Sequence, residues 1–164
     1  MNDLSRPYEA AQAAAWNRST LRAITGLFPV TALVGDMDQG WKPVVLVRLE
    51  ELIHLPIGWD GYNGQPVSFA NAVFAYQMLE QTCRRWTSPP SIVPGNNGDL
   101  QVEWHTNLGD IELHVSAPNE VHAWCATPDD EEGRDLEIRN DFTEVAGWVR
   151  TIVERAVAPV AAAA

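Results

Sequence analysis

Histidines and carboxylates recur at every second position in the second half of the chain, a spacing that would place them on one face of a β-sheet. Residues 100–105 alternate between apolar and polar side chains, and three later segments repeat the pattern, the last more briefly. The polar positions include Glu103, His114 and His122. Two histidines and one carboxylate can hold a zinc ion with an open fourth position, or form a general base with its orienting partner. We therefore consider these three as candidate catalytic and metal-binding residues.

The register of the expected strands decides whether these side chains meet. If Glu103 lies opposite His114, and His105 opposite Glu112, opposite charges face each other across the strands. A shift of two residues would place Glu103 opposite Glu112, which is unfavourable when both are ionised. We therefore expect the first register, and a short connection would then bring His122 opposite His114.

The same pattern also has a simpler interpretation, because a solvated sheet face in an acidic protein gathers glutamate and histidine by composition alone. The chain contains no HExxH, GxSxG or Walker motif. Neither Cys83 nor Cys125 lies in a CxxC or a recognisable catalytic context, and we expect two buried thiols rather than a disulfide. The sequence therefore weighs against an enzyme, and we expect no cofactor and no bound metal.

A glycine-rich loop over residues 58–66 carries a second group of candidates. Three glycines and a proline in this segment restrict where Trp59 and Tyr62 can lie. Asp60 is either a catalytic acid or base, or it caps the turn by accepting hydrogen bonds from the backbone at Tyr62 or Asn63, and capping is the favoured role. The two aromatic residues either form part of a binding surface or fill the gap between helix and sheet.

The charge of the chain limits its partners. A net charge of −11 and a pI near 4.6 argue against direct binding to nucleic acid or to an anionic membrane. A basic protein partner fits this charge, and mimicry of nucleic acid is a second alternative. The acidic run 129–133 reads as an exposed connection between strands or as a contact for such a partner.

We expect a soluble, cytoplasmic protein that does not enter a membrane. The N-terminus lacks a basic start followed by an uninterrupted apolar stretch, and no window approaches the ~18 apolar residues of a membrane span. Seven tryptophans leave self-association into a homodimer open.

The periodicity of the apolar residues predicts an α+β two-layer sandwich, in which an antiparallel sheet of about four strands packs on N-terminal, central and C-terminal helices. Helices are expected over residues 8–25 and 43–55, from Ser68 to about Trp86, and from Asn140 or Asp141 to Pro159. Strands are expected at 100–105, 111–116, 121–125 and 136–139. The 164 residues fit a single domain at 1–158, followed by a disordered alanine-rich tail at 159–164.

The middle third of the chain also resembles a family of small bacterial proteins that has no established activity. The pattern is carried by Gly58-Trp59-Asp60-Gly61-Tyr62, then Pro66, Ser68, Pro90, Ile92, Pro94, Gly98 and Glu103-Trp104. The resemblance implies a bacterial origin and a link to toxin, antitoxin or phage-related modules. It also implies that the loop packs near the first strand, so that Trp59, Asp60, Tyr62, Glu103 and Trp104 form one spatial unit.

These observations lead us to expect a small protein-binding module of an antitoxin-like, immunity-like or regulatory accessory kind. The binding surface would combine the polar sheet face with the aromatic loop. Its expected residues are Trp59, Asp60, Tyr62, Glu103, His105 and Glu112. The alternative is a metal-assisted or general-base hydrolase that uses Glu103, His114 and His122.

Overall fold

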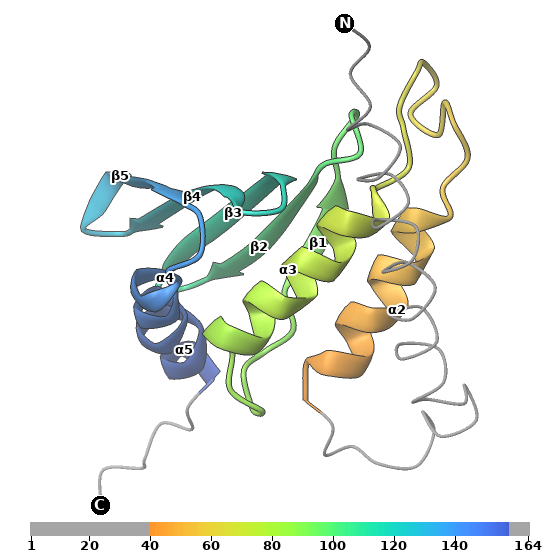
Figure 1. The fold of residues 1–164 in the computed structure, drawn as a ribbon. Helices are drawn as coiled ribbons and strands as arrows, with labels where there is room; N and C mark the ends of the chain where they lie inside the picture. Colours follow the sequence, from red (N-terminus) through yellow and green to blue (C-terminus); the bar gives the residue numbers. More distant parts are fainter. Residues whose placement is uncertain (1–39, 158–164) are drawn as a thin grey trace, which may run out of the picture. The chain divides into compact units, whose positions relative to one another are not determined.

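The computed structural model describes residues 40–157 (Figure 1). The expected helix at 8–25 and the tail at 159–164 lie outside the described residues, as does part of the expected domain 1–158. The described helices are α2 (Lys42–Ile53), α3 (Phe69–Thr82), α4 (Thr143–Trp148), the π-helix η2 (Val149–Glu154) and α5 (Arg155–Val157). The strands are β1 (Ser91–Pro94), β2 (Leu100–Thr106), β3 (Gly109–Ala117), β4 (Glu120–Thr127) and β5 (Asp130–Ile138).

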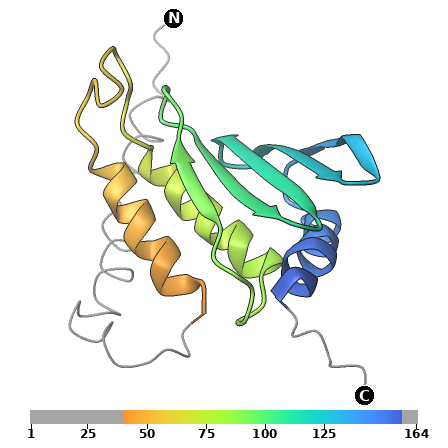
Figure 2. The ribbon, with the colours of Figure 1, turned by 180° about the vertical axis from the view of Figure 1, so that it is seen from behind.

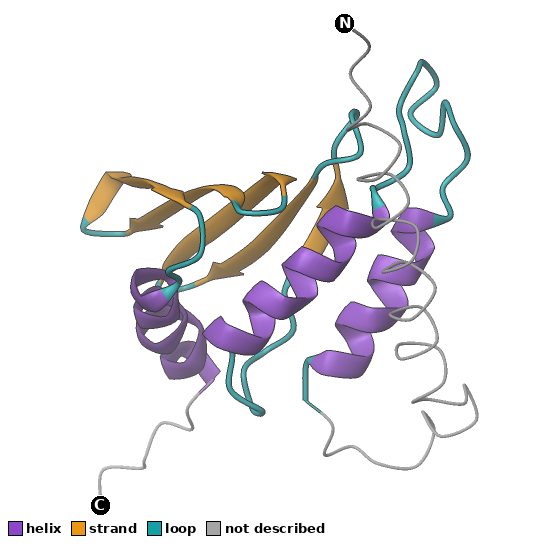
Figure 3. Cartoon of the chain, viewed as in Figure 1, coloured by secondary structure: helices purple, strands orange, loops and turns teal. Residues whose placement is uncertain are grey.

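The architecture is the expected α+β sandwich, with helices on one face of an antiparallel sheet (Figures 1 and 3). The sheet has five strands in the order β1-β2-β3-β4-β5, against about four expected. The additional strand, β1, spans four residues and ends at Pro94, so it is too short to show an alternating pattern. Seen from behind, the other face of the sheet has no described helix over it (Figure 2). We call this the open face.

Alternation along the strands separates the core from the open face. The core side chains of the three central strands are all buried, and they are Leu100, Val102, Trp104, Ile111, Leu113, Val115, Val121, Ala123 and Cys125. The helices bury complementary stripes, such as Val45, Leu49 and Leu52 in α2 and Val145, Val149 and Ile152 at the C-terminus. Both stripes were predicted from helical spacing. Burial of this apolar surface is what holds the helices against the sheet.

The start of α3 follows the predicted capping chemistry, whereas the start of α4 does not. The side chain of Ser68 accepts a hydrogen bond from the backbone of Asn71 and so caps α3. The N-cap of α4 is Phe142, which makes no side-chain cap bond, rather than the expected Asn140 or Asp141. Asp141 lies one residue earlier and accepts from the backbone and the hydroxyl of Thr143. The end of α3 lies at Thr82, four residues before the expected end near Trp86.

The strand register expected between β2 and β3 is wrong. The structure pairs Glu103 with Glu112, His105 with Asp110 and Gln101 with His114. This is a shift of two residues from the expected pairing. Hairpin register is set by the length and type of the turn, and charge pairing was not strong enough to override it here.

The turn that sets this register is only two residues long, Asn107 and Leu108, because Thr106 already pairs with Gly109. The hydroxyl of Thr106 donates to the Gly109 carbonyl and accepts from the Leu108 N–H, both at 3.1 Å. Gly109 has a φ of 145°, and a Cβ at this position would collide with the carbonyl oxygen of Ala126. The turn therefore needs glycine at 109 for both conformation and space.

The acidic run also lies differently from what we expected. Instead of forming a connection, Asp130, Glu131 and Glu132 belong to β5, which is nine residues long. Gly133, with a φ of 72°, follows them where the β4–β5 register shifts. Poor strand formers thus extend the strand because β4 offers a paired edge, a tertiary effect that overrides local preference.

The turn yields a first prediction. Gly109→Ala should lower the free energy of unfolding by about 2 kcal/mol or more, because the new Cβ meets the Ala126 carbonyl in a backbone conformation that favours glycine. Gly147→Ala in α4 is the matched control, since its nearest neighbour is 3.9 Å away, and it should be neutral or stabilising by up to about 1 kcal/mol. Denaturant unfolding of both variants measures the difference, and equal stabilities would contradict the turn described here.

Candidate functional site

The open face is acidic and carries three of the four histidines. Its side chains from β2 to β5 include Gln101, Glu103, His105, Asp110, Glu112, His114, His122, Trp124, Asp135 and Glu137. Among the described strands the only Lys or Arg is Arg134, whose position belongs to the opposite side of the sheet and whose side chain pairs with Glu144 of α4. The open face of the described sheet therefore has no strand residue with a permanent positive charge.

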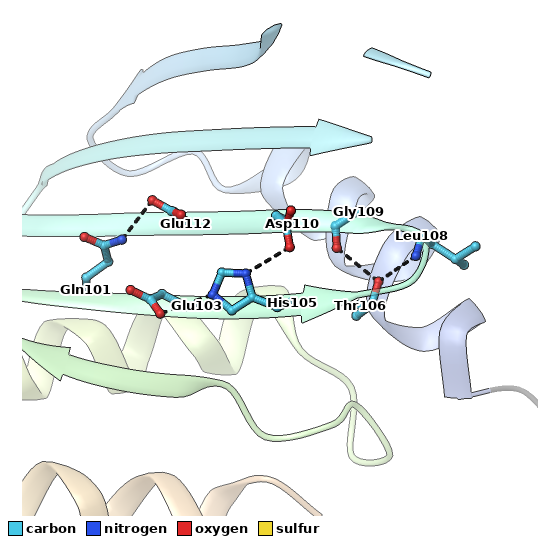
Figure 4. A network of polar contacts seen from close by, with 8 residues as sticks. All are labelled: Gln101, Glu103, His105, Thr106, Leu108, Gly109, Asp110 and Glu112. Carbon is cyan, nitrogen blue, oxygen red and sulfur yellow. Dashed lines mark hydrogen bonds and ion pairs between the residues drawn. The ribbon is translucent and has the colours of Figure 1, made fainter. Parts of the chain in front are cut away.

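Each histidine on this face is paired with a carboxylate. His105 lies between two of them, with Nδ1 at 2.9 Å from Asp110 and Nε2 at 3.3 Å from Glu103 (Figure 4). The hydrogen bond to Asp110, then that to Glu103, raises the pKa of His105 above its ordinary value, because both bonds favour the doubly protonated ring. Next to this group, Gln101 donates to Glu112 at 2.9 Å (Figure 4).

The two other histidines lie opposite each other, as predicted for His114 and His122. Nε2 of His114 is 2.6 Å from Asp99, and Nε2 of His122 is 2.9 Å from Asp135. Partial burial alone would raise the pKa of Asp99, but the hydrogen bonds from His114 and from the Asn97 backbone hold that pKa below its ordinary value. These pairs were not predicted, because each carboxylate becomes a neighbour only once the register is known.

The histidine pair borders a shallow hollow of about 360 Å³ in the open face. Its lining residues are Gln101, Glu112, His114, His122, Trp124 and Asp135. The hollow is a surface depression with acidic and aromatic walls.

The candidate set is only partly brought together, because His114 lies opposite His122 but Glu103 lies opposite Glu112. Glu103 binds His105 on its own strand, whereas His114 and His122 bind aspartates. Within residues 40–157, no group of three or more His, Cys, Asp or Glu side chains is arranged to hold a metal ion. The reason is the register, because the shift of two residues places Gln101 rather than Glu103 opposite His114.

The glycine-rich loop is held by its own side chains. One carboxylate oxygen of Asp60 accepts hydrogen bonds from the backbone of Tyr62 and of Gly64, both at 2.9 Å. These bonds, the one from Tyr62 first, lower the pKa of Asp60. The partly buried Trp59 donates from Nε1 to the Gln65 carbonyl at 3.0 Å. Asp60 is therefore in the predicted capping role.

The internal framework of the loop leaves two large side chains facing solvent. Tyr62 is 86% exposed and Ile57 is 75% exposed. Figure 1 shows the loop, in yellow, beyond the ends of α2 and α3. The loop and the residue before it therefore present an aromatic and an aliphatic side chain to solvent.

The loop bonds to the turn that precedes β2, and the spatial unit expected from the resemblance is only partly present. The Gln65 N–H donates to the Asn96 carbonyl at 2.9 Å, which joins the loop to the same turn as Asp99. Trp104 is buried on the core side, where its Nε1 donates to Ser88 at 2.9 Å. Trp104 and Glu103 point to opposite faces, so the loop does not share a site with both.

The two cysteines carry no nucleophilic chemistry here. Cys83 and Cys125 are free thiols. Burial raises the pKa of the Cys83 thiol to about 12, and burial also raises that of Cys125. Both thiols therefore stay protonated near neutral pH, and a protonated thiol is a poor nucleophile.

Comparisons of the chain with protein-family models, with curated proteins and with solved structures gave no match. Among the described residues, no helix has both the length and the apolar character needed to cross a membrane.

The environment of His105 yields a second prediction. Its pKa should lie above the ordinary histidine value of about 6.5 and should fall in Asp110→Asn, because the variant removes the nearer carboxylate charge. Since the pKa is raised by folding, the stabilisation is complete below about 6.5 and is lost as the pH rises through the folded value. Titration of the imidazole protons by NMR measures both, and Asp135→Asn on β5 is the control that should leave His105 unchanged.

The loop yields a third prediction. In Asp60→Ala the backbone amides of Tyr62 and Gly64 should exchange with solvent faster, because both lose their acceptor. In the wild type the same change should appear as the pH falls through the lowered pKa of Asp60, since protonation removes the charge that the amides stabilise. Hydrogen exchange by NMR measures both effects. Asp60→Asn, which keeps one acceptor oxygen, should fall between wild type and Asp60→Ala.

Proposed function

We propose that this protein is a small, non-enzymatic binding module of an antitoxin-like, immunity-like or regulatory accessory kind, from a bacterial or mobile-element system. Its partner is a protein with a basic surface, which docks on the open face and against the exposed loop. The observation that carries the proposal is the sheet face that no described helix covers, on which acidic residues and acid-paired histidines occur without any strand Lys or Arg among residues 40–157.

Electrostatic complementarity supports this choice of partner. The chain carries a net charge of −11, and a basic surface approaching the open face would meet Glu103, Asp110, Glu112, Asp135 and Glu137. Complementary charges accelerate encounter and are screened by salt. Association should therefore weaken as the salt concentration rises.

The loop supports the same surface because it is joined to the turn that precedes β2, at one end of the open face. Gln65 of the loop bonds to Asn96, and Asp99 of the same turn bonds to His114 on the sheet. Tyr62 would supply an exposed aromatic contact beside the acidic residues of the open face. The hydrolase alternative has weaker support, since Glu103 lies opposite Glu112 and not opposite the pair of His114 and His122.

Capture of partners from an extract of the native cells tests the proposal and provides a fourth prediction. Tyr62→Ala and Glu103→Gln should each reduce recovery of one stoichiometric, salt-sensitive partner at least about fivefold, because they remove an exposed anchor and a facing charge. Circular dichroism should show that both variants keep the fold.

Two matched variants control for the loss of any exposed aromatic or acidic residue. Trp86→Ala removes a side chain that is 68% exposed beyond α3, and Glu50→Gln removes an exposed charge on α2. Both should capture the partner as wild type does. If all four variants behave alike, the open face and the loop are not the binding surface.

A further inference from the structure

The two edges of the sheet differ in what they offer to another chain. At one edge, β1 has four residues, ends at Pro94, and its Ile92 carbonyl accepts a hydrogen bond from Arg48 of α2 at 3.0 Å. That edge is short and partly occupied, which is how natural proteins protect an edge strand. The outer edge of β1 is therefore a poor template for a further strand.

The other edge, β5, is longer and open. It has nine residues, and within residues 40–157 it pairs only with β4, so every second N–H and C=O faces away from the described strands. Figures 1 and 2 both show β5 at the rim of the sheet. Trp124 donates to the Glu132 carbonyl at 3.4 Å, and Gly133 breaks the regular backbone. The regular part of the edge is therefore residues 134–138.

Charge indicates which strand could pair there. The acidic residues of β5 are Asp130, Glu131, Glu132, Asp135 and Glu137, and its single basic residue, Arg134, is paired with Glu144. A second copy of this chain pairing through β5 would place acids beside acids, which is destabilising across strands. A strand rich in Lys and Arg would place opposite charges beside each other.

We propose that the partner docks through a Lys- and Arg-containing extended segment that adds as a sixth strand along β5. Main-chain hydrogen bonds to residues 134–138 would give affinity, and every second side chain of the segment would give specificity. Basic side chains on the open face would lie beside Asp135 and Glu137 and reach toward the hollow at His122. This inference rests on the proposed function and names the way in which its partner binds.

The test uses the full-length ¹⁵N-labelled protein with a synthetic peptide of alternating lysine and valine. Binding should slow the hydrogen exchange of alternate amides in residues 134–138, because the outward N–H groups gain acceptors. A fully N-methylated peptide of the same sequence keeps the charge but donates no backbone hydrogen bond. It should bind at least about tenfold more weakly, which corresponds to the loss of one or two net hydrogen bonds.

The other outcomes separate this inference from the function on which it rests. Equal affinity of the two peptides, without new protection in β5, would overturn strand addition and leave an electrostatic docking face. Protection of β5 in the free protein together with a dimeric mass by sedimentation would show that a second copy covers the edge. A peptide with glutamate in place of lysine is the charge control. If neither basic peptide binds at low salt and the glutamate peptide also fails to bind, both the inference and the proposed basic partner are overturned.

Discussion

The two-residue turn between β2 and β3 is the constraint on which the chemistry of the open face depends. It pairs Thr106 with Gly109, and this pair fixes all the other residue pairs between β2 and β3. The resulting opposition of Glu103 and Glu112 is tolerated because each carboxylate has its own hydrogen-bonding partner, His105 for one and Gln101 for the other. A longer turn would have gathered a carboxylate and two histidines, whereas this one distributes them as separate acid–histidine pairs. The tight turn, with Gly109 at its end, thus sets which charged side chains of the open face lie opposite each other.

The loop and the sheet are two surfaces joined by a short series of backbone bonds. Asp60 and Trp59 hold the loop through hydrogen bonds within it, and the Tyr62 side chain faces solvent. Side chains held in place before binding lose less conformational entropy when a partner arrives. The hydrogen bond from Gln65 to Asn96 joins the loop to the turn between β1 and β2.

Local patterns predicted which residues face the core and which face outward, but not which of them meet. Alternation correctly separated Leu100, Val102 and Trp104 from Glu103, and helical spacing identified the buried stripe of α2. The β1 strand was missed because four residues show no period, and the start of β5 was missed because acidic residues are poor strand formers that only pairing with β4 makes extended. The carboxylates that pair with His114 and His122 lie 15 and 13 residues away in sequence, counted from Asp99 to His114 and from His122 to Asp135. Such pairs depend on the tertiary register and carry no local signal.

The asymmetry between the two sheet edges also limits how this protein can assemble. Continuous fibrils built from stacked strands require two free edges on each molecule, one to receive and one to extend. Here Arg48 occupies the Ile92 carbonyl at the β1 edge, and Pro94 supplies no N–H for further pairing. A second copy of this chain that paired through β5 would therefore expose only the short β1 edge for further pairing. An exposed strand of this kind can remain available for recognition, because pairing of copies through it does not lead to repeated edge-to-edge addition.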